Sequence, residues 1–180
     1  MLAILVAASP EDRAFADSFS GYLRPHFSIV DTIGKTLQTD RSKPPIVICG
    51  MESFGQIDCE KIIIARKQAK PFDKKILGEG KAVAVVDSSD AGLLEHFSQT
   101  KIPAITCGLN RRDTISLSSM SESQAVLDIR RGITCFDGTV IEPQEIPVRM
   151  KAPAYCFSLM AAASVIILSG KIDILIKGKM

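Results

Sequence analysis

The sequence predicts an α/β protein with a mostly parallel sheet, flanking helices and an antiparallel hairpin region in its C-terminal half. Short apolar runs such as 2–7 and 46–49 are typical of strands covered on both faces, and they alternate with helix-like segments. From about 112 to 150 the pattern changes to the alternation of half-buried strands. The apolar segment 155–169 that follows fits a buried helix.

The bulk composition indicates one domain spanning 1–180, because 180 residues with 46% hydrophobic content can fill a substantial core. A net charge of only +2 leaves no electrostatic footprint for nucleic acid or an anionic membrane. The segment 155–169 is shorter than the roughly 20 residues that a bilayer requires. Five cysteines without a CxxC pair, and no basic leader, favour a reducing compartment. We therefore expect a cytoplasmic protein that contacts neither nucleic acid nor membrane.

In the N-terminal half, aliphatic runs predict strands at 2–7, 28–33, 46–49 and 61–65. A helix between the first two begins at Ser9, a good capping residue. Phe15, Phe19 and Leu23 recur every four residues and give it one apolar face, and Pro25 ends it. The polar stretch before residue 46 contains no predicted strand.

Residues 82–109 follow the pattern strand, acidic loop, helix, strand. Asp87 and Asp90 lie in the acidic loop, at the carboxyl end of a predicted parallel strand, where ligands of such sheets usually bind. Their carboxylates are suited to Mg²⁺ or to a ribose hydroxyl. Helix capping by Ser89 or Asp90 is the alternative interpretation. Both interpretations stay open at this point.

In the C-terminal half, the predicted strands are 115–118, 125–130, 132–136, 139–141 and 145–150. Asp137-Gly138 is a strong signal for a two-residue hairpin turn. The apolar helix that begins at Tyr155 is predicted to end at Gly170, and a last apolar run covers 172–176.

Two segments resemble phosphate-binding loops in part. Gly34-Lys35-Thr36 matches the end of a P-loop, but the required first glycine is replaced by Ile29. Gly50 and Gly55 have the glycine spacing after a strand and could cradle an anion, although Gln56 and Ile57 follow in place of Lys and Ser or Thr. The first strand–helix junction, 7–10, has no glycine, which argues against a pyrophosphate there.

Two further side chains are of types that often act in catalysis, but the sequence places no cooperating residues near them. His96 has no serine or cysteine at a spacing that predicts a triad, and nothing near Cys49 would lower its pKa. We therefore interpret both as structural, and no catalytic residue is predicted.

Three short segments resemble motifs of the central, ATP-binding domain of the Mur ligases, the peptide-ligating enzymes of cell-wall synthesis. VVDSSD (85–90) and ITCGL (105–109) occupy the places of that family's Asn-x-Asp-Asp type and Thr-x-Gly type turns. IVICGMES (46–53) resembles the strand with the acidic metal-site motif, which implies Glu52 as a metal ligand. The resemblance implies a P-loop-NTPase-like fold, ATP and Mg²⁺ as cofactors, and a link to the cell wall.

The sequence also departs from the family at the nucleotide site. Residues 7–10 replace the P-loop, and Tyr155 and Ser158 stand where the family's adenine-contacting asparagines would fall. The metal-binding histidine and lysine have no clear counterparts, although Lys70 or Lys74 can be argued. These departures indicate a domain that has lost most of the ATP chemistry.

Three functions follow from these observations. The leading one is a Mur-ligase-like central domain without ATP hydrolysis and without a cofactor, which binds a protein partner or a second copy of itself. The alternative is an ATP- and Mg²⁺-dependent ligase component or nucleotide-binding protein that uses Gly50, Gly55, Asp87 and Asp90, with Glu52 on the metal. The third is a doubly wound regulatory domain in which Asp31, Asp87 or Asp90 accepts phosphate.

Overall fold

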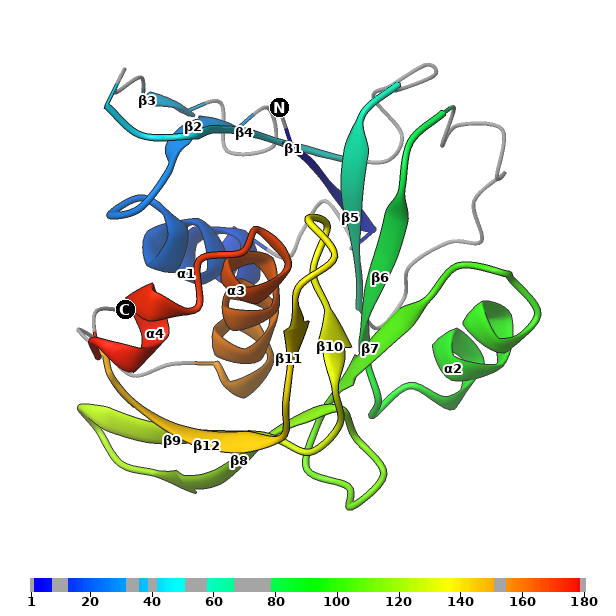
Figure 1. The fold of residues 1–180 in the computed structure, drawn as a ribbon, viewed down its shortest axis with the longest axis vertical. Coiled ribbons are helices and arrows are strands. Elements are labelled where there is room, and N and C mark those ends of the chain that lie inside the picture. Colours follow the sequence, from blue (N-terminus) through cyan, green and yellow to red (C-terminus); the bar gives the residue numbers. More distant parts are fainter. Residues whose placement is uncertain are drawn as a thin grey trace.

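The computed structural model describes residues 2–7, 13–31, 36–38, 42–50, 58–66, 79–150 and 155–178. The predicted alternation of strands and helices is present (Figure 1). In chain order, the elements are β1 (Leu2–Ala7), α1 (Arg13–Leu23), β2 (Ser28–Asp31), β3 (Thr36–Gln38), β4 (Pro45–Gly50), β5 (Glu60–Ala65), β6 (Ala82–Asp87), α2 (Ala91–Ser98), β7 (Ala104–Cys107), β8 (Ile115–Met120), β9 (Gln124–Ile129), β10 (Ile133–Thr134), β11 (Val140–Ile141), β12 (Gln144–Arg149), α3 (Cys156–Leu168) and α4 (Asp173–Ile176).

Ten of these strands form one mixed sheet, in the order β12-β9-β8-β7-β6-β5-β1-β4-β2-β3, and β10 and β11 form a separate hairpin. Every neighbouring pair from β2 through β4, β1, β5, β6 and β7 to β8 is parallel. The pairs β2–β3, β8–β9 and β9–β12 are antiparallel. The predicted fold class, a mostly parallel sheet with an antiparallel hairpin region in the C-terminal half, is therefore confirmed.

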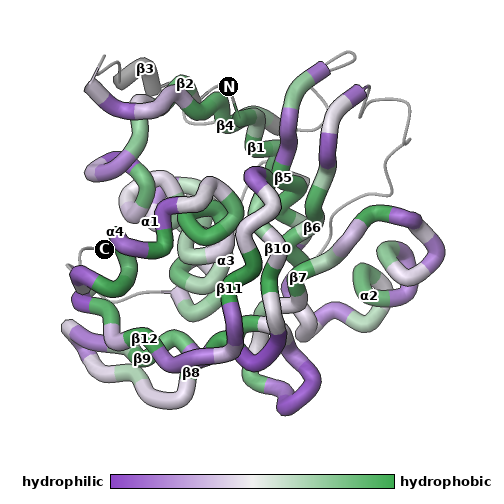
Figure 2. Tube along the Cα trace, viewed as in Figure 1, coloured by the Kyte–Doolittle hydropathy of each residue, from purple (hydrophilic) through white to green (hydrophobic). Residues whose placement is uncertain are grey.

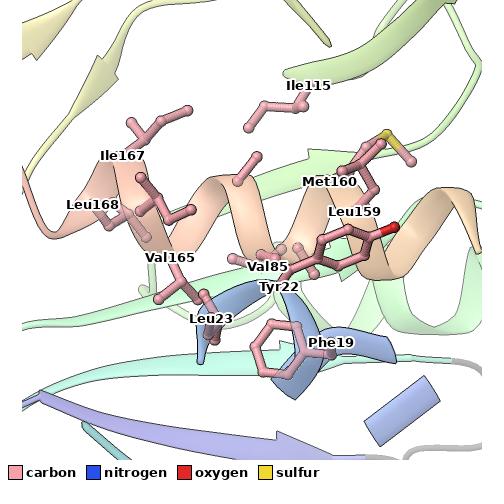
Figure 3. Packing of buried hydrophobic residues seen from close by; sticks show 14 of the residues in the cluster. Phe19, Tyr22, Leu23, Val85, Ile115, Leu159, Met160, Val165, Ile167 and Leu168 are labelled. Atoms are coloured by element: carbon pink, nitrogen blue, oxygen red, sulfur yellow. The ribbon is translucent and has the colours of Figure 1, made fainter. Parts of the chain in front are cut away.

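Helix α3 lies inside the curve of this sheet, with α1 beside it, while α2 lies on the opposite face (Figure 1). All residues of α3 from Phe157 to Leu168 are buried, which explains why the helix is apolar all round rather than on one face. Figure 3 shows Leu159, Val165 and Leu168 of α3 packed among side chains of α1 and the strands. Hydrophobic colours dominate where these elements meet (Figure 2).

The C-terminal end of α3 is completed by the β10–β11 hairpin. The backbone N–H of Phe136 donates to the carbonyl of Leu168 at 3.1 Å, and the Cys135 thiol donates to the carbonyl of Ile167 at 3.0 Å. Gly170 ends the helix at φ +69°, a left-handed conformation that favours glycine, as the sequence predicted. The last turn of α3 is thereby fixed to the hairpin.

The hairpin at Asp137-Gly138 is present, but the prediction of a two-residue turn was wrong. Cys135 N–H donates to the Thr139 carbonyl at 2.8 Å, which leaves three residues between the paired positions. Gly138 takes a positive φ of 89°. Phe136 lies in this three-residue turn, and its N–H binds the end of α3 instead of its own hairpin.

One strand was not predicted, and several predictions lie outside the described residues. Strand β3 is short and polar, and it pairs only at the sheet edge, so its sequence has no apolar period. Thr36 begins this edge strand rather than a helix, which argues against a P-loop there. The segments 8–12, 32–35, 51–57 and 67–78 are not described.

Two predictions made from the composition concern membrane-spanning segments and the role of the cysteines. Within the part of the chain that the structure covers, no helix combines the length and apolar character needed to cross a membrane. All five cysteines are free thiols, and Cys49, Cys107 and Cys135 are buried, as expected for cysteines that act as small core residues.

Candidate functional site

The carboxyl edge of the parallel strands is where the sequence predicted a ligand, and two of the predicted residues lie there. Asp87 ends β6, and one of its carboxylate oxygens accepts both the N–H of Ser89 at 3.0 Å and the hydroxyl of Ser89 at 2.7 Å. Asp90 is the N-cap of α2 and accepts the N–H groups of Gly92 at 3.0 Å and Leu93 at 3.2 Å. Both carboxylates therefore serve as local caps.

Of the other predicted residues, Gly50 is described, and it is not adjacent to this loop. Gly50 ends β4, and β1 and β5 lie between β4 and β6. Three inter-strand spacings put the ends of β4 and β6 about 14 Å apart. Gly55 and Glu52 lie outside the described residues, so the predicted anion loop and metal ligand remain predictions. Among the described residues, no three His, Cys, Asp or Glu side chains are grouped as a metal would require.

A more compact set of polar residues lies at the ends of β6 and β7, and the sequence did not predict it. Asp113 is 3% exposed, and its carboxylate accepts the N–H of Asn110 at 2.8 Å. A Cβ on Gly108 would overlap the Ser88 hydroxyl oxygen and lie 2.7 Å from the Asp113 carboxylate. The Ser88 hydroxyl has no hydrogen-bond partner among the described residues. Only glycine at 108 lets these two side chains approach.

The loop that carries Asp113 is held in place by hydrogen bonds to its neighbours. Arg130 binds Asp128 at 2.6 Å and donates to the carbonyl of Asn110 at 2.7 Å. The N–H of Thr114 donates to the hydroxyl of Thr106 at 3.0 Å. These contacts cross from β7 to β8 and β9, so the polar set is rigid.

Beneath this polar set, Cys107 is fully buried in the core. Burial raises the pKa of its thiol from 9.0 to about 12, with the hydroxyl of Ser164 acting in the opposite direction. The carboxylates of Asp113 and Asp87 raise this pKa further. A thiol that stays protonated near neutral pH is a poor nucleophile, so Cys107 is a packing residue.

The N-terminus of α3 provides the other polar feature of the carboxyl edge. Its N-cap residue, Tyr155, makes no side-chain capping bond, and the hydroxyl of the fully buried Ser158 has no partner among the described residues. The Arg66 guanidinium lies 5.2 Å from the ring centre of Phe15, which stacks on Phe157 of α3 at 5.6 Å. Backbone N–H groups and a nearby cation are compatible with an anion.

A mostly parallel sheet wrapped around an apolar helix, with capped turns at its carboxyl edge, defines a mixed α/β fold. No protein-family model and no curated protein matches the sequence. Solved structures match in fold: MurF from Acinetobacter baumannii over 98% of this chain, with a TM-score of 0.57 and 13% identity. MurF ligase from Thermotoga maritima in complex with ADP matches over 99%, with a TM-score of 0.52 and 12% identity.

The UDP-N-acetylmuramate:L-alanyl-gamma-D-glutamyl-meso-diaminopimelate ligase from Neisseria meningitides also matches, over 99% of this chain with a TM-score of 0.52 and 9% identity. This chain spans 44%, 48% and 66% of the three proteins, respectively. The fold is therefore similar to that of the Mur ligases, and the resemblance predicted from the short motifs is confirmed at the level of the fold.

Proposed function

We propose that this chain is a Mur-ligase-like domain that binds a protein partner and does not hydrolyse ATP. The observation that carries the proposal is how the polar side chains at the carboxyl edge of the parallel strands are hydrogen-bonded. One oxygen of each of the Asp87 and Asp90 carboxylates, the best ligand candidates in the sequence, already accepts N–H or hydroxyl groups of residues two or three positions further along the chain. Together with the glycine-free junction 7–10, this leaves few groups for Mg²⁺ and phosphates in the part of this edge that the structure describes.

The surface best suited to a partner lies at the far end of the antiparallel strands. There β8, β9, β12 and the end of α4 line a groove of about 770 Å³, called the α4 groove below. Met120 and Ile176 line it and are 48% and 56% exposed. Large apolar side chains gathered in one groove on the surface are typical of interaction sites.

The charges of the α4 groove indicate what it binds. Arg149 and Lys177 are its charged residues, and no acidic side chain is among the described residues that line it. Strand β12 forms the sheet edge but contains Pro147, which has no N–H for another strand and so disfavours edge-to-edge pairing of two copies. The fitting occupant is an acidic segment of a partner protein with apolar side chains between its carboxylates.

A labelled peptide that alternates leucine and glutamate tests this groove by fluorescence anisotropy. Arg149→Glu and Lys177→Glu are expected to weaken its binding about tenfold each, because each reverses a charge beside the bound carboxylates. Lys101→Glu is the charge-matched control, since Lys101 precedes β7 and does not line the groove. If all three variants lost the same affinity for the peptide, the effect would come from the net charge of the protein and not from the groove. Failure of the wild-type protein to bind the peptide would overturn the proposal.

A second candidate, nucleotide binding, is favoured by the uncapped N-terminus of α3 with its buried Ser158 hydroxyl, and by Arg66, which lies over Phe15 next to Phe157 of α3. Isothermal titration with Mg-ATP separates the two candidates. We expect no saturable binding at micromolar concentrations, and Asp87→Asn should leave the titration unchanged. Micromolar binding that Arg66→Met abolishes would instead establish the second candidate and overturn the first.

A further inference from the structure

A second pocket lies at the amino edge of the parallel strands, opposite the edge discussed so far. Leu2, Ile46 and Glu60, from the first residues of β1, β4 and β5, lie in one row of the sheet and form one wall. The turn of the β10–β11 hairpin and the end of α3 form the other. The pocket measures about 310 Å³ and is called the amino-edge pocket below.

The lower part of the amino-edge pocket is apolar. Phe27, Ile46, Phe136 and Leu168 line it, and each is buried by the rest of the protein. Side chains that are already packed lose little conformational entropy when a ligand binds, and an apolar group placed there leaves water at about 25 cal/mol per Å². The volume is at the lower end of the range for small-molecule sites, and it suits a ligand the size of one amino acid.

The wall opposite the strands is rigid. Phe136 is fixed on both sides, because its N–H donates to Leu168 and its carbonyl accepts the Lys81 ammonium at 3.0 Å. Asp137 follows it, and a Cβ on Gly170 would lie 2.8 Å from the Asp137 carboxylate, so that carboxylate is held against the end of α3. The polar groups of this wall are therefore positioned before any ligand arrives.

The rim of the pocket carries charges of both signs. The carboxylates are Glu60 and Asp137, and the cation is Lys171. The N–H and hydroxyl of Thr139 hold the pKa of Asp137 below its usual range, so this carboxylate is ionised at neutral pH. No ion pair joins the side chains of Glu60 and Lys171 to other described residues. The charges of Glu60 and Lys171 are therefore available to a ligand, while Asp137 also accepts the Thr139 N–H and interacts with the Lys81 charge.

We propose that the amino-edge pocket binds a free α-amino acid with an apolar side chain. The ammonium lies at Glu60 and Asp137, the carboxylate lies at Lys171, and the side chain enters the apolar part of the pocket. A fatty acid would bring a carboxylate to a rim with two carboxylates, and an amine would leave Lys171 without a partner. Of small ligands, a zwitterion alone satisfies both signs of charge.

Three ligands of matched shape test the charge pattern: L-leucine, isoamylamine, which lacks the carboxylate, and 4-methylpentanoate, which lacks the ammonium. Binding is followed by the amide chemical shifts of Phe136 and Leu168 in the full chain. We expect L-leucine to bind at least about tenfold more tightly than either analogue, since each analogue loses a charge-assisted hydrogen bond. Equal affinities, or no saturable shift with L-leucine, would overturn the proposal.

Two substitutions assign the charges to their residues. Lys171→Met should lower the affinity for L-leucine to that for isoamylamine and leave isoamylamine unchanged. Glu60→Gln should lower the affinity for L-leucine and for isoamylamine by the same factor, because both ligands carry the ammonium. Lys101→Met is the matched control, since Lys101 lines neither the amino-edge pocket nor the α4 groove, and it should change neither affinity. If Lys171→Met retains the preference for L-leucine, the assignment is wrong. Peptide binding at the α4 groove reports separately on the proposed function.

Discussion

Replacing Leu159 with alanine is expected to lower the free energy of unfolding by about 3 kcal/mol. Leu159 is fully buried in α3 and lies among Tyr22, Met160 and the neighbouring core side chains (Figure 3). Its removal costs the transfer free energy of the lost methyl groups and also leaves a cavity, because sheet and helices enclose α3 and collapse only in part. Chemical denaturation followed by circular dichroism measures the change.

Leu109→Ala is the matched control, because it deletes the same atoms from a side chain that is 70% exposed. Surface substitutions of this kind change the free energy of unfolding by less than about 0.5 kcal/mol. If the two leucine variants were destabilised equally, α3 would not be the centre of the core. The comparison therefore tests the architecture on which both candidate sites depend.

Most of the fold could be predicted because its determinants are local in the sequence. The aliphatic runs of β1, β4, β5 and β6 have the unbroken apolar character of strands buried on both faces. Gly170 and the Asp90 cap also act on adjacent residues. The end of the helix at Gly170 was predicted from its residue type and position, and Asp90 was one of the two residues considered as a cap. Strand β3 was missed because its pairing, rather than its side chains, makes it a strand.

The candidate sites could be predicted only in part, because they depend on contacts between distant segments. Ser88, Gly108 and Asp113 meet through the parallel pairing of β6, β7 and β8, and no spacing in the sequence indicates that contact. The Asp137-Gly138 turn was correctly placed, but its docking on α3 was not predicted. That docking creates a wall of the amino-edge pocket, so this pocket had no signal in the sequence.

Raising the pH from about 9 to about 12 is expected to destabilise the protein through Cys107 by about 3 kcal/mol. In the unfolded chain this thiol ionises near its ordinary value of 9.0, whereas burial raises its pKa in the folded protein to about 12. Between these values the folded state holds a proton that the unfolded state has lost. Stability therefore falls with rising pH, by about 1.4 kcal/mol per pH unit. Well below pH 9, where the thiol is protonated in both states, Cys107 causes no loss of stability.

Cys107→Ala isolates this contribution, although the variant starts less stable because it lacks a buried sulfur. Tyr22 and Cys135, whose pKa values are also raised by burial, titrate in both proteins and cancel in the difference. Urea unfolding at a series of pH values should show the wild type losing about 2 kcal/mol more than the variant between about pH 9 and pH 11. Ser164→Ala is the control, because it alters the same packing but keeps the thiol, and its curve should stay as steep as the wild type. Parallel curves for wild type and Cys107→Ala would mean that water reaches Cys107 below the Ser88–Asp113 set, and the rigidity inferred for the carboxyl edge would be wrong.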